Sequence, residues 1–368
     1  MTKRDQFIQY VRHGGPQPLC SPQIGAGAGF DTRLAGKEWI SETTLADTIA
    51  AVGRFDIVPL INLGLPDPGD WNPALRWHQT GERREPEQVT RDFELRTPHG
   101  TLTKQVTETR REGTFQPKYP VTGDADLAAF EWVVDAMGAG DFSAVTRQVR
   151  AAVDEIAGRA ALDIQWAMQP YEMLCFPNTV DTVLLAQDQP EFFQRLMDKI
   201  IALDLKLQDA VAAGGADFVF LGGPGSEMIS PSYYRDYLIP YSKIVTAEAR
   251  RRGLLVYTHI CSPVQPFLDL GFYNEMGLDL FETLSPPPVG NVKSLAEAMT
   301  KLDPAICTRG NLGLDVLLNG TPEDVRRGTE TILRETAGRK HLVAAGDYLF
   351  YATPEANVAA MAETVARQ

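Results

Sequence analysis

Residues 254–261 of this chain read LLVYTHIC, an apolar run that ends in a histidine and a cysteine. A short apolar run of this kind is typical of a buried strand in a parallel sheet. His259 and Cys261 follow the run directly and so belong to the strand end. An imidazole and a thiolate are ligands that zinc prefers, and a cysteine beside a histidine can also be an activated nucleophile. A buried cysteine next to a hydrogen-bonded histidine is the third interpretation, because two-residue motifs often arise by chance.

Similar apolar runs recur along the chain and alternate with helical patterns. Strands are predicted at residues 57–63, 162–168, 218–221, 278–284, 305–308 and 341–345, in addition to 254–258. Alternation of strands and helices predicts a parallel sheet. We expect an eighth strand within the irregular first 100 residues. Seven or eight such units in 368 residues favour an α/β fold of the (β/α)8 TIM-barrel type, with a doubly wound open sheet as the alternative.

Residues 71–123 interrupt this rhythm. They contain Trp71, Trp77 and a charged run, followed by β segments in which His99-Gly100 indicates a hairpin turn. We interpret 71–123 as an inserted, lid-like segment that packs over one end of the barrel. The whole chain, 1–368, is then a single barrel domain with an N-terminal extension. The GAGAG run at residues 25–29 lacks the residues of a nucleotide-binding loop, so we interpret it as a loop near the pocket.

The composition limits the possible partners and location. Apolar residues make up 44% and charged residues 23%, which is typical of a globular protein. The formal net charge of −13 argues against a nucleic-acid partner or an anionic membrane surface, because both require a basic face. No apolar run reaches the ~18 residues of a membrane span, and the polar start differs from a signal peptide. With four scattered cysteines, a reducing cytoplasm is the expected location.

Polar residues stand at nearly every predicted strand end. In (β/α)8 barrels the active site lies at the carboxyl ends of the strands. These positions hold Asn62, Gln169, Tyr171, Glu172, Glu227, His259, Cys261, Glu282, Arg309, Asn311 and Asp347. A barrel that needed only stability would not require polar groups at the ends of apolar strands. The pattern therefore predicts a binding or catalytic site at this end.

His259, Cys261 and Asp347 are the predicted metal ligands. Three protein ligands with one open position are typical of a catalytic zinc site. Glu227 or Glu282 would complete the shell or act as a nearby catalytic acid or base.

Glu282 has two interpretations. Its apolar neighbours suggest burial, which favours the protonated form that can donate a proton. An ion pair with Arg309 is the alternative. The predicted substrate-binding residues are Gln169, Tyr171, Arg309 and Asn311.

The second half of the chain resembles the uroporphyrinogen decarboxylase superfamily. The resemblance covers about residues 160–365 and rests on residues 214–217 (GGAD), 229–231 (ISP), 237–241 (YLIPY), 259–261 (HIC), 310–312 (GNL), Gly346 and 353–357 (TPEAN). It implies a (β/α)8 barrel and an enzymatic function.

Two branches of the superfamily differ in their use of metal. Uroporphyrinogen decarboxylase itself needs no metal and binds the acidic side chains of its tetrapyrrole through an Arg-bearing N-terminal segment and an Asp. Asp31 and Arg33 of this chain do not reproduce that pattern. The methylcobamide:coenzyme M methyltransferases and related corrinoid-linked enzymes bind zinc through a His-x-Cys pair and a later Cys. His259 and Cys261 match this pair, so the chain resembles the second branch more closely.

The third ligand departs from the pattern of that branch, because Asp347 stands where the methyltransferases carry Cys. An oxygen ligand leaves more positive charge on zinc than a thiolate does, which favours an oxygen substrate over a thiol. The resemblance therefore implies a zinc-dependent methyltransferase or demethylase that acts on a small methylated substrate. A corrinoid carried by a partner protein, or tetrahydrofolate, would be the methyl carrier, and a homodimer is the expected assembly.

Two other functions stay open. The first is a metal-assisted decarboxylase or carbon–carbon lyase that acts on a small carboxylate, with Arg309 as a clamp for that carboxylate. The second is a non-catalytic binder of small molecules, which the polar strand ends disfavour.

Overall fold

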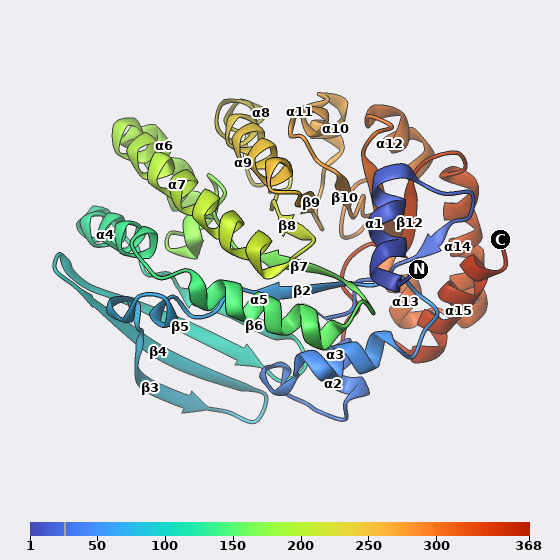
Figure 1. Cartoon of the computed structure of the whole chain (residues 1–368), viewed down its shortest axis with the longest axis horizontal. Helices are drawn as coiled ribbons and strands as arrows, with labels where there is room; N and C mark the ends of the chain where they lie inside the picture. The colour runs from blue at the N-terminus through green and yellow to red at the C-terminus, as the bar shows by residue number, and fades with distance from the viewer. Residues whose placement is uncertain (26) are drawn as a thin grey trace.

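Eight parallel strands form the central sheet of the protein, whose computed structural model describes residues 1–25 and 27–368. The strands are β1 (Leu19–Cys20), β2 (Leu60–Gly64), β7 (Ala161–Gln165), β8 (Phe218–Phe220), β9 (Leu255–His259), β10 (Leu280–Glu282), β11 (Cys307–Leu312) and β12 (His341–Ala345). Their order is β1-β12-β11-β10-β9-β8-β7-β2. All seven strands predicted from the apolar runs are therefore present (Figure 1).

The two end strands, β1 and β2, are linked by a backbone hydrogen bond. The N–H of Val58, just before β2, donates to the carbonyl of Cys20 in β1 at 2.9 Å. This bond closes the sheet, and the predicted (β/α)8 barrel is confirmed. The eighth strand, β1, lies in the first 100 residues as expected, although it contains only two residues. Ala26 of the predicted glycine-rich loop lies outside the described residues.

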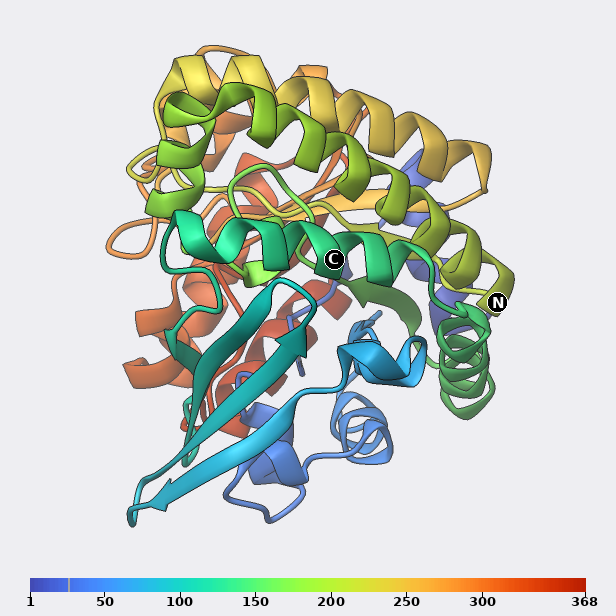
Figure 2. The same ribbon diagram turned by 90° about the vertical axis from the view of Figure 1, so that its left-hand side faces the viewer.

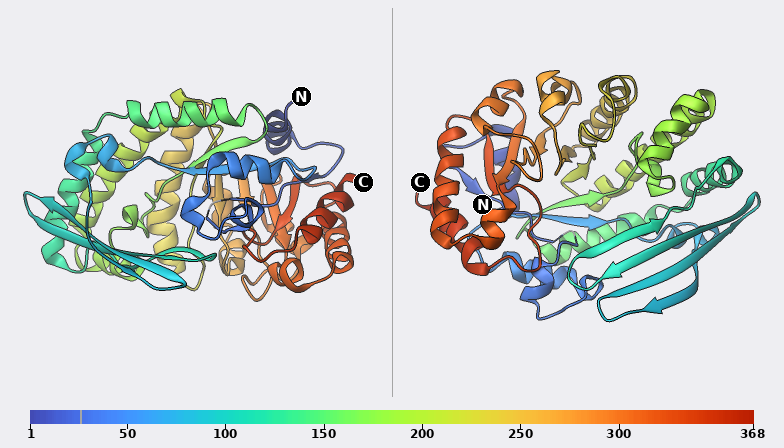
Figure 3. Two further views of the ribbon diagram at one scale, coloured as in Figure 1. Left: turned by 90° about the horizontal axis from the view of Figure 1, so that it is seen from below. Right: turned by 180° about the vertical axis from the view of Figure 1, so that it is seen from behind.

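Helices surround the barrel and follow most of its strands (Figures 1 and 3). The helices are α1 (Lys3–His13), α2 (Phe30–Leu34), α3 (Leu45–Val52), α4 (Leu127–Gly138), α5 (Ser143–Ile156), α6 (Thr179–Asp188), α7 (Pro190–Gly214), α8 (Pro231–Tyr233), α9 (Ile239–Arg251), α10 (Gln265–Asp269), α11 (Phe272–Glu275), α12 (Leu295–Lys301), α13 (Leu314–Asn319), α14 (Pro322–Glu335) and α15 (Glu355–Ala366). Among the described residues, no helix is both long and apolar enough to cross a bilayer.

Helix α1 closes the amino-terminal end of the barrel. Its buried Phe7, Tyr10 and Val11 join one hydrophobic cluster with residues that begin the strands, such as Leu60 and Leu280. Burying each large apolar side chain contributes about 1.5–3 kcal/mol. With one end filled in this way, the carboxyl ends of the strands are the open end of the barrel.

The inserted segment forms a second, antiparallel sheet beside the barrel. Its strands are β3 (His78–Arg84), β4 (Gln88–Thr97), β5 (Gly100–Thr109) and β6 (Gly113–Lys118), in that order. Thr97 pairs with Gly100, so the predicted hairpin is present, and its turn residues are Pro98 and His99, one position earlier than the predicted His99-Gly100 pair. Strands β4 and β5 contact α4, and the long hairpins extend past the helices (Figure 2). We call this sheet the lid sheet.

The register of three neighbouring strands sets the level of the polar residues. Glu282 of β10 pairs with His259 of β9 on one side and with Arg309 of β11 on the other. Residues paired across neighbouring strands point to the same face. All three side chains therefore occupy one level at the carboxyl end of the barrel.

Gly310 is required for this register, and its replacement tests that requirement. Gly310 has a φ of +148°, and a Cβ there would overlap the carbonyl oxygen of Thr283 in the neighbouring segment. We expect Gly310→Ala to lower the free energy of unfolding by about 3 kcal/mol in urea titrations.

Gly138, at the end of α4, is the matched control, because a Cβ there meets no atom of the described residues within 4 Å. Gly138→Ala should be neutral or stabilise by up to about 1 kcal/mol. Equal stability of the two variants would contradict this account of the strand register.

Candidate functional site

The three predicted metal ligands meet at the carboxyl end of the barrel. His259 is the last residue of β9, Cys261 follows two residues later, and Asp347 follows β12. One ligand atom from each, a nitrogen, a sulfur and an oxygen, lies within 4.8 Å of the other two. Because β9 and β12 are not neighbours in the sheet, these side chains meet across the barrel mouth. We call His259, Cys261 and Asp347 the ligand cluster.

The two ring nitrogens of His259 have different partners. Its Nε2 lies 3.1 Å from Asp347 Oδ1, and its Nδ1 lies 3.5 Å from Glu282 Oε2. The Tyr348 ring packs on the imidazole at a centroid distance of 4.8 Å. Histidine ligands of metals commonly have a carboxylate at the ring nitrogen that does not bind the metal. Glu282 therefore has the position of a group that orients His259, with Nε2 directed towards the ligand cluster.

The surroundings of His259 favour a positive charge. Burial lowers the pKa of the imidazole, but Asp347, Cys261 and Glu282 together outweigh this effect and raise the pKa well above its ordinary value. The ligand cluster is also open to solvent, because Cys261 is exposed. The geometry can thus hold a cation with one side accessible to a small molecule.

Glu282 and Arg309 form a buried ion pair. Both side chains are 1% exposed, and Arg309 Nη1 lies 3.1 Å from Glu282 Oε1. The other guanidinium nitrogens donate to the carbonyls of Ser21 and Pro22, at 2.6 Å from Nε and 3.2 Å from Nη2. Gln23 also donates to Glu282, at 3.0 Å. The pair therefore anchors the segment after β1 to the barrel interior.

This ion pair corrects two expectations from the sequence. Burial acts to raise the pKa of Glu282, but Arg309 and His259 outweigh it and leave the pKa below its ordinary value. Glu282 is therefore an ionised carboxylate and not the proton donor that its apolar neighbours suggested. Arg309 is fully engaged with protein groups, so it is not available as a clamp for a substrate carboxylate.

The remaining predicted residues lie around the cluster in different settings. Glu227 is exposed, its carboxylate lies beside Gly225, and it does not belong to the ligand cluster. Gln169 and Tyr171 are buried and pack against Gly222 in the loop after β8. Asn311 donates from Nδ2 to the Leu284 carbonyl at 2.9 Å. The substrate contacts expected of Gln169, Tyr171 and Asn311 stay predictions.

A polar network lies beside the cluster, and of its members only Asn62 was among the polar strand-end residues predicted from the sequence. Asp163 of β7 is fully buried, and its Oδ2 accepts hydrogen bonds from Asn62 Nδ2 at 2.9 Å and from the Tyr257 hydroxyl at 2.7 Å. Gln165 donates to Tyr257 at 2.8 Å and to Tyr348 at 3.3 Å. The sequence signal that could have indicated this network is the pair of polar residues Asp163 and Gln165 within the otherwise apolar strand β7. The network reaches His259 through the Tyr348 ring.

Burial raises the pKa of Asp163 to about 8, although hydrogen bonds from Asn62 and Tyr257 partly oppose this effect. Asp163 is therefore mostly protonated at neutral pH. A buried neutral carboxylic acid can both donate and accept a hydrogen bond.

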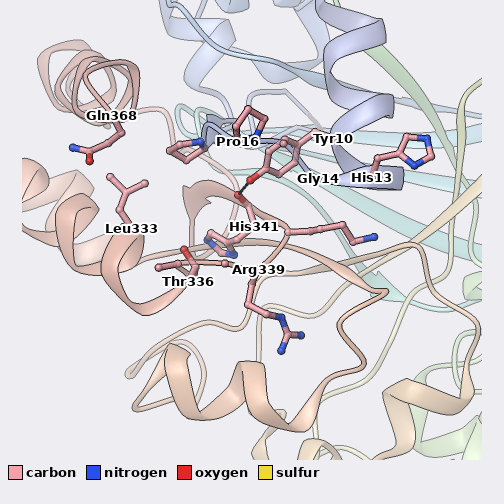
Figure 4. Close-up of a pocket in the computed structure, with 14 residues that line it drawn as sticks. Tyr10, His13, Gly14, Pro16, Leu333, Thr336, Arg339, His341 and Gln368 are labelled. Atoms are coloured by element: carbon pink, nitrogen blue, oxygen red, sulfur yellow. Dashed lines mark hydrogen bonds between the residues drawn. The ribbon is translucent and has the colours of Figure 1, made fainter.

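One cavity is remote from this site. Its volume is about 610 Å³, and it lies between α1 and the turn before β12, lined by Tyr10, Arg339 and His341 among others (Figure 4). Tyr10 donates to the carbonyl of His341, the first residue of β12, at 3.1 Å. This cavity is at the amino ends of the strands, whereas active sites of this fold lie at the carboxyl ends. A cavity of about 260 Å³ lies on the other side, between the lid sheet and the barrel, with Gln165 in its wall.

Comparisons with known proteins agree on one family. The family model described as uroporphyrinogen decarboxylase (URO-D) matches residues 109–368. A uroporphyrinogen decarboxylase of Synechococcus sp. is 26% identical over 222 residues, which cover 57% of this chain and 60% of the relative. The enzyme of the same name from Syntrophotalea carbinolica is 26% identical over 259 residues, covering 67% and 71%. The chain thus spans less than two thirds of the first of these relatives.

A solved structure shares the fold over the full length. A methyltransferase from Methanosarcina mazei matches with a TM-score of 0.72 at 14% identity, covering 100% of this chain and 99% of the other. At this identity the similarity concerns the fold alone.

Removing Arg309 tests the importance of the buried ion pair. We expect Arg309→Met to lower the free energy of unfolding by about 3–5 kcal/mol, because Glu282 would remain buried without a counter-ion. The double variant Arg309→Met/Glu282→Gln should regain most of this loss. Urea unfolding of both variants measures these free energies. An Arg309→Met protein whose free energy of unfolding is within about 1 kcal/mol of wild type would contradict the importance of the buried ion pair.

Asp163 should make stability depend on pH. Its pKa is raised from 3.8 to about 8 in the folded state, so the folded protein retains a proton that the unfolded chain releases. The contribution is complete below the unfolded pKa and is lost as the pH rises through the folded pKa. Urea midpoints should therefore fall between about pH 5 and pH 8 in wild type more than in Asp163→Asn. Parallel pH profiles of the two proteins would contradict this state of Asp163.

Proposed function

Because this chain belongs to the uroporphyrinogen decarboxylase (URO-D) family, we propose that it is a zinc-dependent enzyme that removes a methyl group from a small methylated substrate. The observation that carries the proposal is the ligand cluster of His259, Cys261 and Asp347 at the barrel mouth. The resemblance of the sequence assigns a His-x-Cys pair to the zinc-binding methyltransferases of this superfamily. A metal-free decarboxylase has no need of such a cluster.

The residues of the cluster fit zinc by their chemistry. One imidazole nitrogen, one sulfur and one carboxylate oxygen are ligand types that zinc accepts, and three protein ligands leave one position open. The carboxylates of Asp347 and Glu282 at the two ring nitrogens of His259 support the same assignment, because negative groups favour a bound cation. When bound, zinc would supply a Lewis acid that polarises an oxygen atom of the substrate.

The surrounding residues would prepare the cluster for this chemistry. Glu282, kept ionised by Arg309, lies at Nδ1 of His259 and so directs Nε2 towards the other two ligands. Tyr348 covers one face of the imidazole and excludes water from it. Asp347 supplies oxygen in place of sulfur, which favours an oxygen-containing substrate over a thiol.

The methyl carrier would come from outside the chain. Two cavities have Gln165 in their walls, with volumes of about 260 Å³ and about 350 Å³, which are near the lower limit for small-molecule pockets. Either cavity therefore suits a small substrate and not a corrinoid in addition. We propose that a corrinoid on a partner protein, or tetrahydrofolate, approaches from the open side at Cys261.

Metal-assisted decarboxylation or carbon–carbon cleavage of a small carboxylate is the second candidate. It is supported by the relatives that match this chain, which are named uroporphyrinogen decarboxylase. The two candidates share the ligand cluster and differ in the need for a methyl carrier.

Metal analysis of the purified protein tests the proposal. We expect about one zinc per chain after dialysis, which His259→Ala and Cys261→Ala should lose. Cys175→Ser is the control, because Cys175 is an exposed thiol outside the cluster and should keep the metal in place. A metal-free protein with full activity would overturn the zinc assignment.

Product analysis separates methyl transfer from cleavage. Turnover of methylated substrates should require an added corrinoid protein or tetrahydrofolate. Release of carbon dioxide or an aldehyde without either carrier would instead support the decarboxylase or lyase.

A further inference from the structure

The cavity between the lid sheet and the barrel has mostly apolar walls and two charged lining residues, Lys104 and Asp67. Its lining includes Trp77 and Leu95 of the inserted segment, Met137 of α4 and Phe176 after β7. Lys104 of β5 is the lysine in this lining. Aromatic and aliphatic walls of this kind suit a ligand with a flat, apolar body.

The ammonium group of Lys104 forms no direct ion pair with a carboxylate among the described residues. Among the described residues, the side chain of Lys104 makes no hydrogen bond or salt bridge, and its Nζ lies 4.5 Å from the centroid of the Trp77 ring. The pKa of Lys104 is lowered because the side chain is desolvated, an effect that Asp67 partly opposes. Asp67 also lines the cavity, but its Oδ1 accepts the N–H of Gly69 at 2.7 Å. Lys104 therefore offers an unused donor to a ligand.

Desolvation makes an unpaired ammonium costly. The cation–π contacts of Nζ with the Trp77 and Phe93 rings, at 4.5 Å and 5.7 Å from the centroids, offset only part of that cost. A ligand carboxylate beside Nζ would add a charge-assisted hydrogen bond in a place where little water competes. The combination of one ammonium and apolar walls thus discriminates against neutral polar molecules and against small hydrated anions, which gain nothing from the walls.

A chain of side-chain contacts links the cavity wall to the ligand cluster. Gln165 lines the cavity and donates to the Tyr348 hydroxyl at 3.3 Å, and the Tyr348 ring packs on His259. A ligand with its carboxylate at Lys104 can therefore direct its opposite end towards Gln165 and the barrel mouth. Such an orientation would present a substituent to the site while the charge remains at the lid sheet.

We propose that this cavity binds a small carboxylate with an aromatic or similarly flat apolar body, and that Lys104 selects for the negative charge. The identification of this ligand as the substrate rests on the proposed function. The inserted segment is then a source of substrate specificity, since it supplies both Lys104 and Trp77.

A fluorescence titration with benzoate tests the proposal on the full-length protein. Trp71, Trp77 and Trp166 line the cavity, so benzoate binding should change the tryptophan emission in a saturable manner. Lys104→Met should weaken benzoate binding by about tenfold or more, which is the effect of losing a hydrogen bond to a charged group. Benzamide, which is neutral and of the same shape, should bind equally to wild type and Lys104→Met.

Lys118→Met is the matched control variant. Lys118 lies on the neighbouring strand β6, is exposed, and donates to Thr103 at 2.7 Å. The Lys118→Met protein should bind benzoate with the affinity of wild type. The absence of saturable benzoate binding to wild type, or equal binding by Lys104→Met, would overturn the proposal.

His259→Ala separates this inference from the proposed function. We expect His259→Ala to keep its affinity for benzoate, while the zinc content of the same samples reports on the ligand cluster independently. Benzoate binding that disappears in His259→Ala but persists in Lys104→Met would place the anion at the cluster and overturn the role of Lys104.

Discussion

The buried ion pair between Glu282 and Arg309 connects the wall of the barrel to the candidate site. Arg309 holds the segment after β1 through two backbone carbonyls, and it keeps Glu282 ionised behind His259. A buried charge without its partner is strongly destabilising, so each member requires the other. The pair therefore links the closure of the barrel, the strand register and the orientation of the His259 imidazole in one set of contacts.

Much of the fold could be predicted because buried parallel strands carry continuous apolar runs. The apolar runs that correspond to β7, β9 and β12 are examples. Strand β1 could not be found in this way, because two residues have no periodicity. The ligand cluster was predictable for a related reason: His259, Cys261 and Asp347 follow strands, and strand ends meet in this fold.

Other features depend on tertiary contacts that no local pattern reveals. The partner of Arg309 is decided by the register of β10 and β11, so the sequence left a substrate clamp and an ion pair equally open. Asp163 was hidden within an apolar strand, and only the barrel interior brings Asn62 and Tyr257 to it. Lys104 lies on a lid strand whose charged pattern gives no sign that this side chain faces a cavity.

The central claim is that one nitrogen, one sulfur and one oxygen from this chain form a single metal site. X-ray absorption spectroscopy at the zinc edge of the loaded protein measures the ligand set directly. The account predicts one sulfur at about 2.3 Å, with the remaining ligands being nitrogen or oxygen at about 2.0–2.2 Å. The sulfur signal should be lost from any zinc that Cys261→Ala retains. Two or more sulfur ligands, or a sulfur signal unchanged in Cys261→Ala, would contradict it.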